Sequence, residues 1–490
     1  MLFNTIDFVI FFIVVLSTIT IIKYRKFQHL FILFASYFFF YYTSNYLITL
    51  LIFTTLWDFY FGKLIYNANT IKRKKVILVL SLAGNLGLLG FFKYADFAIT
   101  QFNILGRYFD LGTNIPLLNL ALPIGISFYT FHSITYTVSI FRGQISPAKS
   151  FTEYAIFVAF FPQLVAGPIL RAKDFLPQLR EKIEGLETGS KLRQILIQKS
   201  NLKYGITLMA LGFFKKMFFA DNVSVLVNDI FQNPIGESSF TIILGAIAFG
   251  IQIYCDFSGY SDIAIGAAAI MGFKIPINFN KPYFATSPSD FWRRWHISLS
   301  SWLRDYLYIP LGGNRKSEYR TYLNLFIVMF LGGLWHGASW NFVIWGILHG
   351  VYLAIHKMIT NKFPAFVAHP FFKNKIGIFV SILLTQYLVF FAWIAFRVRE
   401  TNAMLYSMKK YVLLDFQTHE VIKIIIAHKL EVGLIILFVI LHLISYKQKN
   451  LPERIANFGL VKWTVFLVLI MLSILFFYDL HPEDFIYFKF

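Results

Sequence analysis

The chain has 490 residues, of which 57% are hydrophobic, 19% aromatic and only 14% charged. Soluble domains carry about 25% charged residues, so this composition excludes an ordinary soluble enzyme and predicts a polytopic membrane protein. The formal net charge of +20 comes mainly from loops between apolar segments, at residues 72–75, 171–203 and 293–320. We interpret these clusters as the cytoplasmic side of the protein, facing anionic lipid, rather than as a nucleic acid site. Some of these side chains can also bind a phosphorylated cytoplasmic substrate.

Apolar segments of about the length needed to span a membrane recur along the whole chain. They cover residues 3–22, 27–42, 44–62, 76–92, 117–141, 204–220, 240–257, 322–334, 338–359, 376–396, 430–446 and 462–478. The first segment has its positive charges after it, at residues 23–26, which is the reverse of a cleaved signal peptide and predicts a retained helix with its N-terminus outside. The basic residues at 447–462 place the last loop in the cytoplasm, so both termini are expected outside and the number of crossings is odd. We expect eleven.

Residues 153–170, EYAIFVAFFPQLVAGPIL, form an interrupted apolar segment. Pro162, Gly167 and Pro168 break it, and a broken helix is tolerated at membrane depth only where protein covers the freed backbone groups. We therefore predict a re-entrant or buried segment, followed at 171–203 by the longest candidate extramembrane stretch. The whole chain, 1–490, is predicted to be one transmembrane domain. It comprises N-terminal helices (1–120), a core with the polar motifs (121–360), and C-terminal helices with a short tail (361–490).

Residues 283–320 predict an amphipathic helix that is too polar to span the membrane. Ser287 can cap its N-terminus, Pro288 suits the first turn, Asp290 suits the positive end of the helix, and Pro310 ends it. One face carries the aromatic stripe Trp292, Trp295, Leu299, Trp302 and Tyr306, and another carries Arg293, His296, Ser300 and Arg304. On spacing alone, His296 is more often an interfacial anchor than a catalytic group.

Residues 332–350, GGLWHGASWNFVIWGILHG, place a histidine in an uncharged apolar segment. An ionisable residue in a membrane indicates a functional site, and burial keeps an imidazole neutral and able to accept a proton. Packing between helices explains His336 equally well. Glycines beside it allow a backbone or substrate to approach closely. His349 lies about 220° from His336 on an ideal helix, so we do not pair them, and we interpret His349 and His356 as structural.

Several motifs resemble the membrane-bound O-acyltransferase (MBOAT) family, in the order in which that family has them. They are LPIGISFYTFHSITYTVSIFRG at 122–143, FFPQLVAGPILR at 160–171, CDFSGYSDIAIGAAAIMGF at 255–273, WRRWHISLSSWLRDYLYIPLGGNR from 292, FLGGLWHGASWNFVIWGILHG from 330 and the tail FIYFKF at 485–490. The closest resemblance is to the branch of alginate and peptidoglycan O-acetyltransferase membrane subunits. The family commonly has glutamine where His132 stands here, which we regard as a tolerated exchange.

The resemblance implies an all-α polytopic fold, a ring of about eleven helices around a central tunnel. It implies that His336 is the catalytic histidine and His296 the second histidine of this branch. It also implies acetyl-CoA as acyl donor, a periplasmic SGNH-type acetyltransferase partner, and a polysaccharide acceptor reached through that partner. In related systems the C-terminal motif is thought to carry the acyl group on its tyrosine, here Tyr487. An aromatic belt at the membrane surface or a docking peptide for the partner explains the motif equally well. The implied location is the bacterial cytoplasmic membrane.

This assignment is chemically coherent, because a thioester is already activated and a single neutral histidine can deprotonate a hydroxyl nucleophile. We expect no metal and no bound cofactor: the sequence contains no HExxH, GxSxG or GxxxxGK[ST] motif. The single cysteine, Cys255, is expected to be an inert, packed thiol. Candidate substrate-binding residues are Arg293, Arg294 and Arg304 for the phosphates of CoA, Trp335 beside His336, and Asp262. Membrane anchoring explains the arginines at least as well. Asp262 is expected to be buried and to pair with an arginine or a histidine.

Other functions fit less well. A secondary transporter would show inverted repeats and paired broken helices, and no repeat is visible here. A lipid- or protein-modifying acyltransferase of the same superfamily, or D-alanyl transfer to teichoic acid, is the alternative. The sequence does not identify the polymer, although a composition rich in Phe, Ile, Lys and Asn mildly favours peptidoglycan over alginate.

Overall fold

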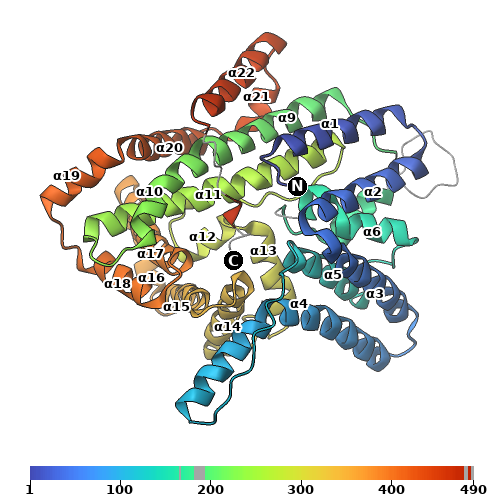
Figure 1. The fold of residues 1–490 in the computed structure, drawn as a ribbon, viewed down its shortest axis with the longest axis horizontal. Helices are drawn as coiled ribbons and strands as arrows, with labels where there is room; N and C mark the ends of the chain where they lie inside the picture. Colours follow the sequence, from blue (N-terminus) through green and yellow to red (C-terminus); the bar gives the residue numbers. More distant parts are fainter. Residues whose placement is uncertain (165–166, 181–193, 479–483, 487–490) are drawn as a thin grey trace. The chain divides into compact units, whose positions relative to one another are not determined.

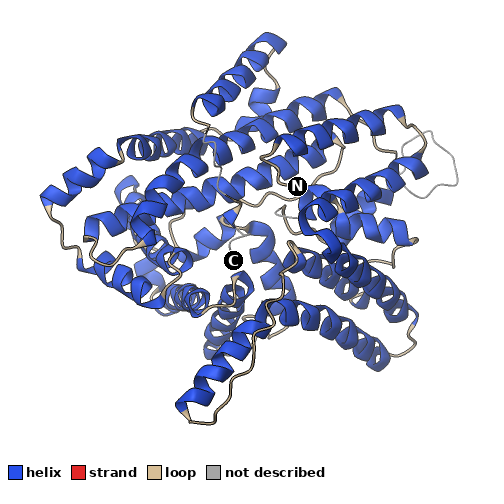
Figure 2. Ribbon diagram, in the orientation of Figure 1, coloured by secondary structure: helices blue, strands red, loops and turns tan. Residues whose placement is uncertain are grey.

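A computed structural model of the chain describes residues 1–164, 167–180, 194–478 and 484–486. These residues form helices and loops, and no strand occurs among them (Figures 1 and 2). Within the same ranges, six helical segments are long and apolar enough to cross a membrane, and Ile6–Ile21 and Leu460–Phe476 are shorter apolar helices. The all-α, multi-pass fold class is therefore confirmed, while the number of eleven crossings stays a prediction.

The chain divides into two compact units. The first comprises residues 1–209 with 263–276, and the second comprises 210–262 with 277–490. The predicted three-part division of a single domain stays a prediction.

The first unit is built from the N-terminal helices and from parts of α9 and α11. Its helices are α1 (Ile6–Ile21), α2 (Arg25–Ser44), α3 (Ile48–Asn67), α4 (Ile71–Tyr108), α5 (Ile126–Phe141), α6 (Phe151–Ala159), α7 (Phe161–Leu164), α8 (Ala172–Arg180) and the start of α9 (Lys199–Phe213). The apolar segment predicted at 117–141 is wrong in its first part, because α5 begins only at Ile126. Pro123 cannot donate a helical hydrogen bond, and Gly125 has a φ of +79°, so this turn ends the preceding loop.

The interrupted segment 153–170 is broken and covered by protein, as predicted. Helix α6 ends at Ala159, and α7 restarts at Phe161. Every side chain from Glu153 to Leu164 is buried. The freed N–H of Phe161 donates to Ser36 Oγ at 3.2 Å, and Gln163 Nε2 donates to the carbonyl of Phe157 at 2.6 Å. Side chains therefore satisfy the backbone groups that the break exposes.

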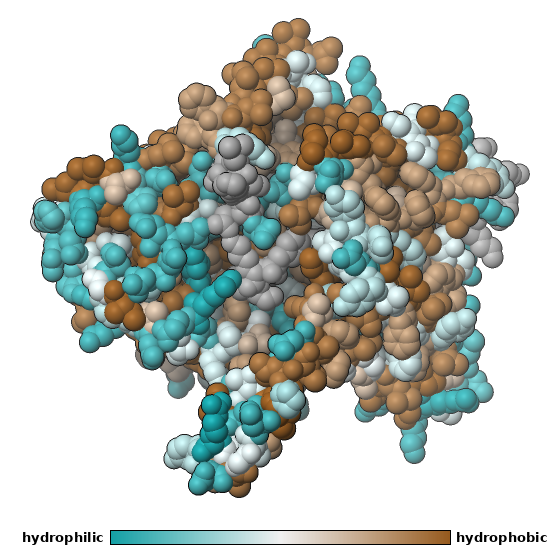
Figure 3. Space-filling model, in the orientation of Figure 1, coloured by the Kyte–Doolittle hydropathy of each residue, from teal (hydrophilic) through white to brown (hydrophobic). Residues whose placement is uncertain are grey.

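The second unit contains all the candidate site residues that the structure describes. Its helices are the end of α9, α10 (Asp221–Gln232), most of α11 (Ser239–Ile270), α12 (Pro288–Arg294), α13 (Ile297–Leu303), α14 (Glu318–His336), α15 (Trp340–Lys362), α16 (Pro364–Val367), α17 (Lys375–Arg397), α18 (Thr401–Leu413), α19 (Thr418–Ala427), α20 (Lys429–Lys447), α21 (Leu451–Ala456) and α22 (Leu460–Phe476). Short 3₁₀ or π-helical turns connect several of them, including a π-helix over Phe214–Ala220 that joins α9 to α10. The exposed surface of α22 is apolar, which Figure 3 shows in brown at the top, as expected for a helix that faces lipid.

The helix predicted within 283–320 begins as expected but is not continuous. Ser287 caps α12, its hydroxyl accepting from the N–H of Asp290 at 3.2 Å, and Pro288 occupies the first position. The helix then breaks at Trp295, and His296 adopts a left-handed backbone with φ +41° before α13 begins. The single aromatic stripe was therefore wrong, because the break rotates the two halves relative to each other. Arg304–Tyr308 continue as a π-helix.

Helices α14 and α15 form a hairpin of close helices. A Cβ placed on Gly346 of α15 would lie 2.5 Å from the carbonyl oxygen of Met329 and 3.1 Å from the Cα of Gly333, so glycine alone allows this approach. At one end of the hairpin, Asn361 Nδ2 donates to Glu318 Oε1 at 3.3 Å. At the other end lie His336 and the turn that leads to α15.

Candidate functional site

His336 is the last residue of α14 and is held in an aromatic cage. Its side chain is 5% exposed. The ring centroid lies 4.9 Å from that of Trp335, 4.9 Å from that of Trp345 on α15, and 5.0 Å from that of Phe396 on α17. Three helices of the second unit therefore fix one imidazole, which is the geometry that a positioned general base requires.

His296 is completely buried, so its interpretation as an interfacial anchor was wrong. Its Nδ1 lies 3.3 Å from Asn278 Oδ1, and the same oxygen accepts from the Ser298 hydroxyl at 2.6 Å and from the Ser298 N–H at 3.3 Å. Because a backbone N–H donates to this atom, it is the amide oxygen, and an oxygen that only accepts places the hydrogen on Nδ1. In the neutral ring the basic nitrogen is then Nε2.

Trp335 brings the two histidines together. Its ring centroid lies 6.2 Å from that of His296 and 4.9 Å from that of His336, and it is itself buried. His296 and His336, 40 residues apart in sequence, thus both contact the same indole ring. This arrangement is what a two-histidine site needs, and it comes from the break that turns α12 into α13.

The comparison of His336 with His349 on one ideal helix was wrong, because the two residues lie on different helices. Both rings nevertheless contact Trp345, His349 at 4.8 Å. His349 packs against Phe291 at 6.0 Å, and His356 Nδ1 lies 3.2 Å from Ser289 Oγ, so both connect α15 to α12. His132 is buried in the first unit, 5.9 Å from Phe157.

The three candidate arginines lie on or directly after α12 and α13, and two of them are paired. Arg294 Nε contacts Asp290 at 3.0 Å, and the exposed Arg304 contacts Asp305 at 2.7 Å, which raises the pKa of Arg304. Arg293 is exposed, and its Nε donates to the carbonyl of Ser289 at 3.3 Å.

A residue that the sequence analysis missed, Lys281, lies beside Arg294. The N–H of the preceding residue, Asn280, donates to the Arg294 carbonyl at 2.9 Å. Partial burial and the positive charge of Arg294 both lower the pKa of Lys281. Two neighbouring cations of this kind favour an anion between them.

Asp262 is half-buried and pairs with Lys215 at 2.6 Å, rather than with an arginine or a histidine. Lys215 belongs to the π-helix between α9 and α10. Spacing along the sequence does not predict which residues of α11 this π-helix contacts. Cys255, about two turns earlier on α11, is completely buried as expected for a packed thiol.

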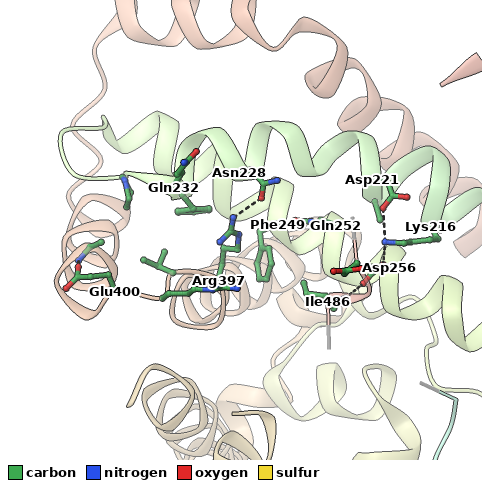
Figure 4. Close-up of a pocket in the computed structure, with 17 residues that line it drawn as sticks. Lys216, Asp221, Asn228, Gln232, Phe249, Gln252, Asp256, Arg397, Glu400 and Ile486 are labelled. Carbon is green, nitrogen blue, oxygen red and sulfur yellow. Dashed lines mark hydrogen bonds and ion pairs between the residues drawn. The ribbon is translucent and has the colours of Figure 1, made fainter. Parts of the chain in front are cut away.

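A polar pocket of about 500 Å³ lies near the histidine site in the second unit (Figure 4). Its lining comes from α10, α11, the end of α17 and the C-terminal segment, and includes Lys216, Asn228, Gln252, Asp256, Arg397 and Ile486. Phe249 also lines it and packs 6.5 Å from Phe396, the ring that contacts His336. Two ring contacts, of Phe249 with Phe396 and of Phe396 with His336, thus link the lining of the pocket to the catalytic candidate.

The C-terminal segment is described at residues 484–486, and Tyr487 lies outside the described residues. Phe485 is completely buried, and its ring lies 4.2 Å from that of Tyr260 and 5.9 Å from that of Phe257. The Phe257 ring in turn lies 4.6 Å from that of His296. Phe485 is therefore docked against Phe257, the ring that packs on His296.

Sequence reasoning also missed Asn278, which orients His296. The sequence KIPINFN shows that Asn278 is an amide in an apolar region. Its hydrogen-bonding partner, His296, is known only from the structure, because the helix break brings His296 to it. The fold and this site together define a multi-pass helical membrane protein with a two-histidine site enclosed by aromatic side chains.

The comparisons with known proteins agree with this class. The model of the membrane-bound O-acyltransferase family, MBOAT, matches residues 143–400. A Pseudomonas putida protein named "Probable alginate O-acetylase AlgI" is 41% identical over 73% of this chain and 71% of its own length. The peptidoglycan O-acetyltransferase of Helicobacter pylori is 34% identical over 85% of this chain and 80% of its own length. The teichoic acid D-alanyltransferase of Streptococcus thermophilus is 29% identical over 54% of this chain and 68% of its own length. The chain belongs to the MBOAT family and is a membrane-bound O-acyltransferase.

Proposed function

We propose that this O-acyltransferase takes an acetyl group from acetyl-CoA at the cytoplasmic side and passes it across the membrane for O-acetylation of a cell-envelope polysaccharide. The observation that carries the proposal is the convergence of His336 and His296 on Trp335. It is supported by relatives whose names refer to the acetylation of alginate and of peptidoglycan. The acceptor polymer is accordingly peptidoglycan or an alginate-like exopolysaccharide.

In the proposed reaction, the imidazole of His336 acts as the general base. It accepts the proton of an acceptor hydroxyl, and the hydroxyl oxygen forms a bond to the thioester carbonyl carbon. The tetrahedral intermediate then collapses, the carbon–sulfur bond breaks, and the CoA sulfur leaves and takes up the proton from the histidinium. His296, with its Nδ1 directed at Asn278, is the second histidine of the site and stands ready to move a proton at Nε2. The aromatic cage excludes water, which would otherwise hydrolyse the thioester.

The donor is proposed to bind along α12 and α15. Arg293, Arg294 and Lys281 lie at the end of α12 and beside it, where they can bind the phosphates of CoA. On α15, His356 contacts Ser289 of α12, and Trp345 contacts His336. His356 and Trp345 are 11 residues apart, or roughly 16 Å along the helix. An elongated thioester with its phosphates at one end and its acyl group at the other fits this separation, and a short acyl donor does not.

The proposed location is the bacterial cytoplasmic membrane, with both termini in the periplasm. The positive residues Arg315, Lys316 and Arg320, just before and within the first turn of α14, then face the cytoplasm, and His336 lies at the opposite end of that helix. A periplasmic SGNH-type acetyltransferase is proposed to receive the acyl group and deliver it to the polysaccharide.

A second candidate function is transfer of a D-alanyl group to teichoic acid from a carrier-bound thioester. The Streptococcus thermophilus relative favours it, but at lower identity and over a smaller share of the chain. The lipid- or protein-modifying branches of the family remain the further alternative.

The test compares two buried histidines of the same hairpin. Full-length protein in nanodiscs is given radiolabelled acetyl-CoA, and thioester consumption and protein-bound label are followed for wild type, His336→Gln and His349→Gln. Loss of the general base should slow turnover by about 10²- to 10⁴-fold. His349→Gln should retain turnover, since His349 packs against the aromatic rings of Phe291, Trp292 and Trp345 and has no proposed role in proton transfer. Wild-type protein that consumes no acetyl-CoA, even with the periplasmic partner added, would exclude this donor and favour the carrier-bound thioester.

The role proposed for Tyr487 needs its own experiment. If its phenol carries the acyl group, Tyr487→Phe should abolish label on the C-terminal peptide and transfer to the partner. Full transfer by Tyr487→Phe, with the partner complex intact, would leave the tail with a docking role alone.

A further inference from the structure

A buried ionic cluster lies in the second unit where the π-helix Phe214–Ala220 faces α11. Lys216 is 1% exposed, and its Nζ lies 2.7 Å from Asp221 Oδ1 and 2.8 Å from Asp256 Oδ1. The π-helix is the local cause, because its wider turn directs Lys216 inward between α10 and α11 (Figure 4). Single π-helical turns of this kind occur frequently at functional sites.

A contribution to folding stability does not explain why the chain has a buried ionic cluster here. Replacing a buried ion pair by apolar side chains of similar volume is often neutral or stabilising, because the charges must be removed from water. Here one ammonium is shared by two carboxylates, so the cluster needs further donors. Asp256 uses Oδ1 for Lys216 and accepts at Oδ2 from the backbone N–H of Ile486 at 2.7 Å. Lys216 therefore fixes the orientation in which Asp256 meets the C-terminal segment.

The side chains of the C-terminal segment strengthen this contact. Asp256, Phe257 and Tyr260 lie on one stretch of α11, and the ring of Phe485 packs on both aromatic residues. Ile486 is 6% exposed. The segment is thus held by a charge-assisted backbone hydrogen bond and by a buried aromatic ring, 230 residues away in sequence from its receptor.

We propose that Lys216, Asp221 and Asp256 form a receptor for the C-terminal segment, and that these three positioning residues hold residues 484–486 beside the aromatic ring that packs on His296. The function of the receptor is to hold residues 484–486 at a fixed position beside the site that contains His296. This functional consequence rests on the acyl transfer proposed above, whereas the docking itself does not.

The two adjacent lysines of the π-helix provide a matched pair for the test. Lys216→Met and Lys215→Met each remove one ion pair to an aspartate of α11, but only Lys216 orients the carboxylate that binds the tail. Hydrogen exchange of the C-terminal peptide is measured in full-length protein in nanodiscs. Loss of a hydrogen bond to a charged group corresponds to roughly 10- to 100-fold faster exchange, which we expect for Lys216→Met and Asp256→Ala and not for Lys215→Met. Equal exchange in Lys216→Met and Lys215→Met would overturn the proposal.

A variant in the tail avoids any misfolding caused by unpaired buried carboxylates. Ile486→Pro removes the N–H donor and fixes φ at this residue without leaving a buried carboxylate or ammonium unpaired by truncation of its partner, whereas Ile486→Val keeps the donor. We expect Ile486→Pro to release the C-terminal peptide, to retain thioester binding with an unchanged KM for acetyl-CoA, and to lose transfer to the external acceptor by at least tenfold relative to Ile486→Val. Full transfer by a released tail would refute the positioning role. A wild-type protein that consumes no thioester would refute the proposed function instead, while the exchange data would still decide whether the tail docks.

Discussion

Replacing Gly346 by alanine is expected to damage the proposed catalytic site from a position that does not touch His336. The new Cβ would lie 2.5 Å from the carbonyl oxygen of Met329, whereas ordinary contact begins at 3.4 Å, so α14 and α15 must separate by about 0.9 Å. Trp345, the neighbouring residue, contacts the His336 ring and would move with α15. Overpacking of a close contact costs about 1–3 kcal/mol, and the higher helix propensity of alanine recovers about 1 kcal/mol.

The expected result is therefore a net loss of up to about 2 kcal/mol in stability and a fall in turnover of about 10²-fold, since a displacement near 1 Å has an effect of that size on a positioned group. Thermal unfolding and acetyl-CoA turnover are measured on protein in nanodiscs. Gly332→Ala is the matched control, because its Cβ would meet only Leu303 Cδ1 at an ordinary 3.6 Å. Gly346→Ala with the stability and turnover of Gly332→Ala would show that helix proximity does not position His336.

Three further predictions concern the surroundings of the site. Lys281→Met and Arg294→Gln should raise KM for acetyl-CoA about tenfold or more. KM for S-acetylpantetheine, which lacks the nucleotide phosphates, should stay unchanged. An equal rise in KM for both donors would refute a phosphate site. Asn278→Ala should lower kcat about tenfold, because it removes the hydrogen bond that orients His296. Asn278→Asp should place a carboxylate beside the imidazole, raise the pKa of His296 and move the acid limb of the pH–rate profile to higher pH. An unchanged profile would exclude a titrating role for His296. Cys255 should react with maleimide only after unfolding in detergent such as dodecyl sulfate, and labelling of the folded protein would contradict its complete burial.

Local sequence patterns predicted the helical elements and several of their ends. The cap at Ser287, the break within 153–170 and several of the apolar spans are local signals, and the structure has them. The break at His296 was not predictable, because the helical spacing continues through it. The competing contact comes from Asn278, 18 residues earlier, which binds the first residues of α13.

The site residues were predicted as a set but not as an arrangement. His336 and His296 were identified from their motifs, and only the tertiary structure places Trp335 between them. The partner of Asp262 was wrong because a salt bridge between α11 and the π-helix depends on packing rather than on spacing. Lys281 was missed for a related reason: a single lysine in a basic region has no distinguishing signal until its neighbour in space is known.

The π-helix over Phe214–Ala220 should make this part of the chain intolerant of insertions and deletions. Its extra residue lets two consecutive lysines reach two different carboxylates on α11, Asp262 and Asp256. Consecutive residues of an α-helix point about 100° apart, so deleting one residue here would turn everything after it by that angle. Asp221 would leave Lys216, and α10 would present a different face to the pocket. Substitutions in this turn are therefore expected to have graded effects, whereas a deletion or insertion of one residue should abolish function outright.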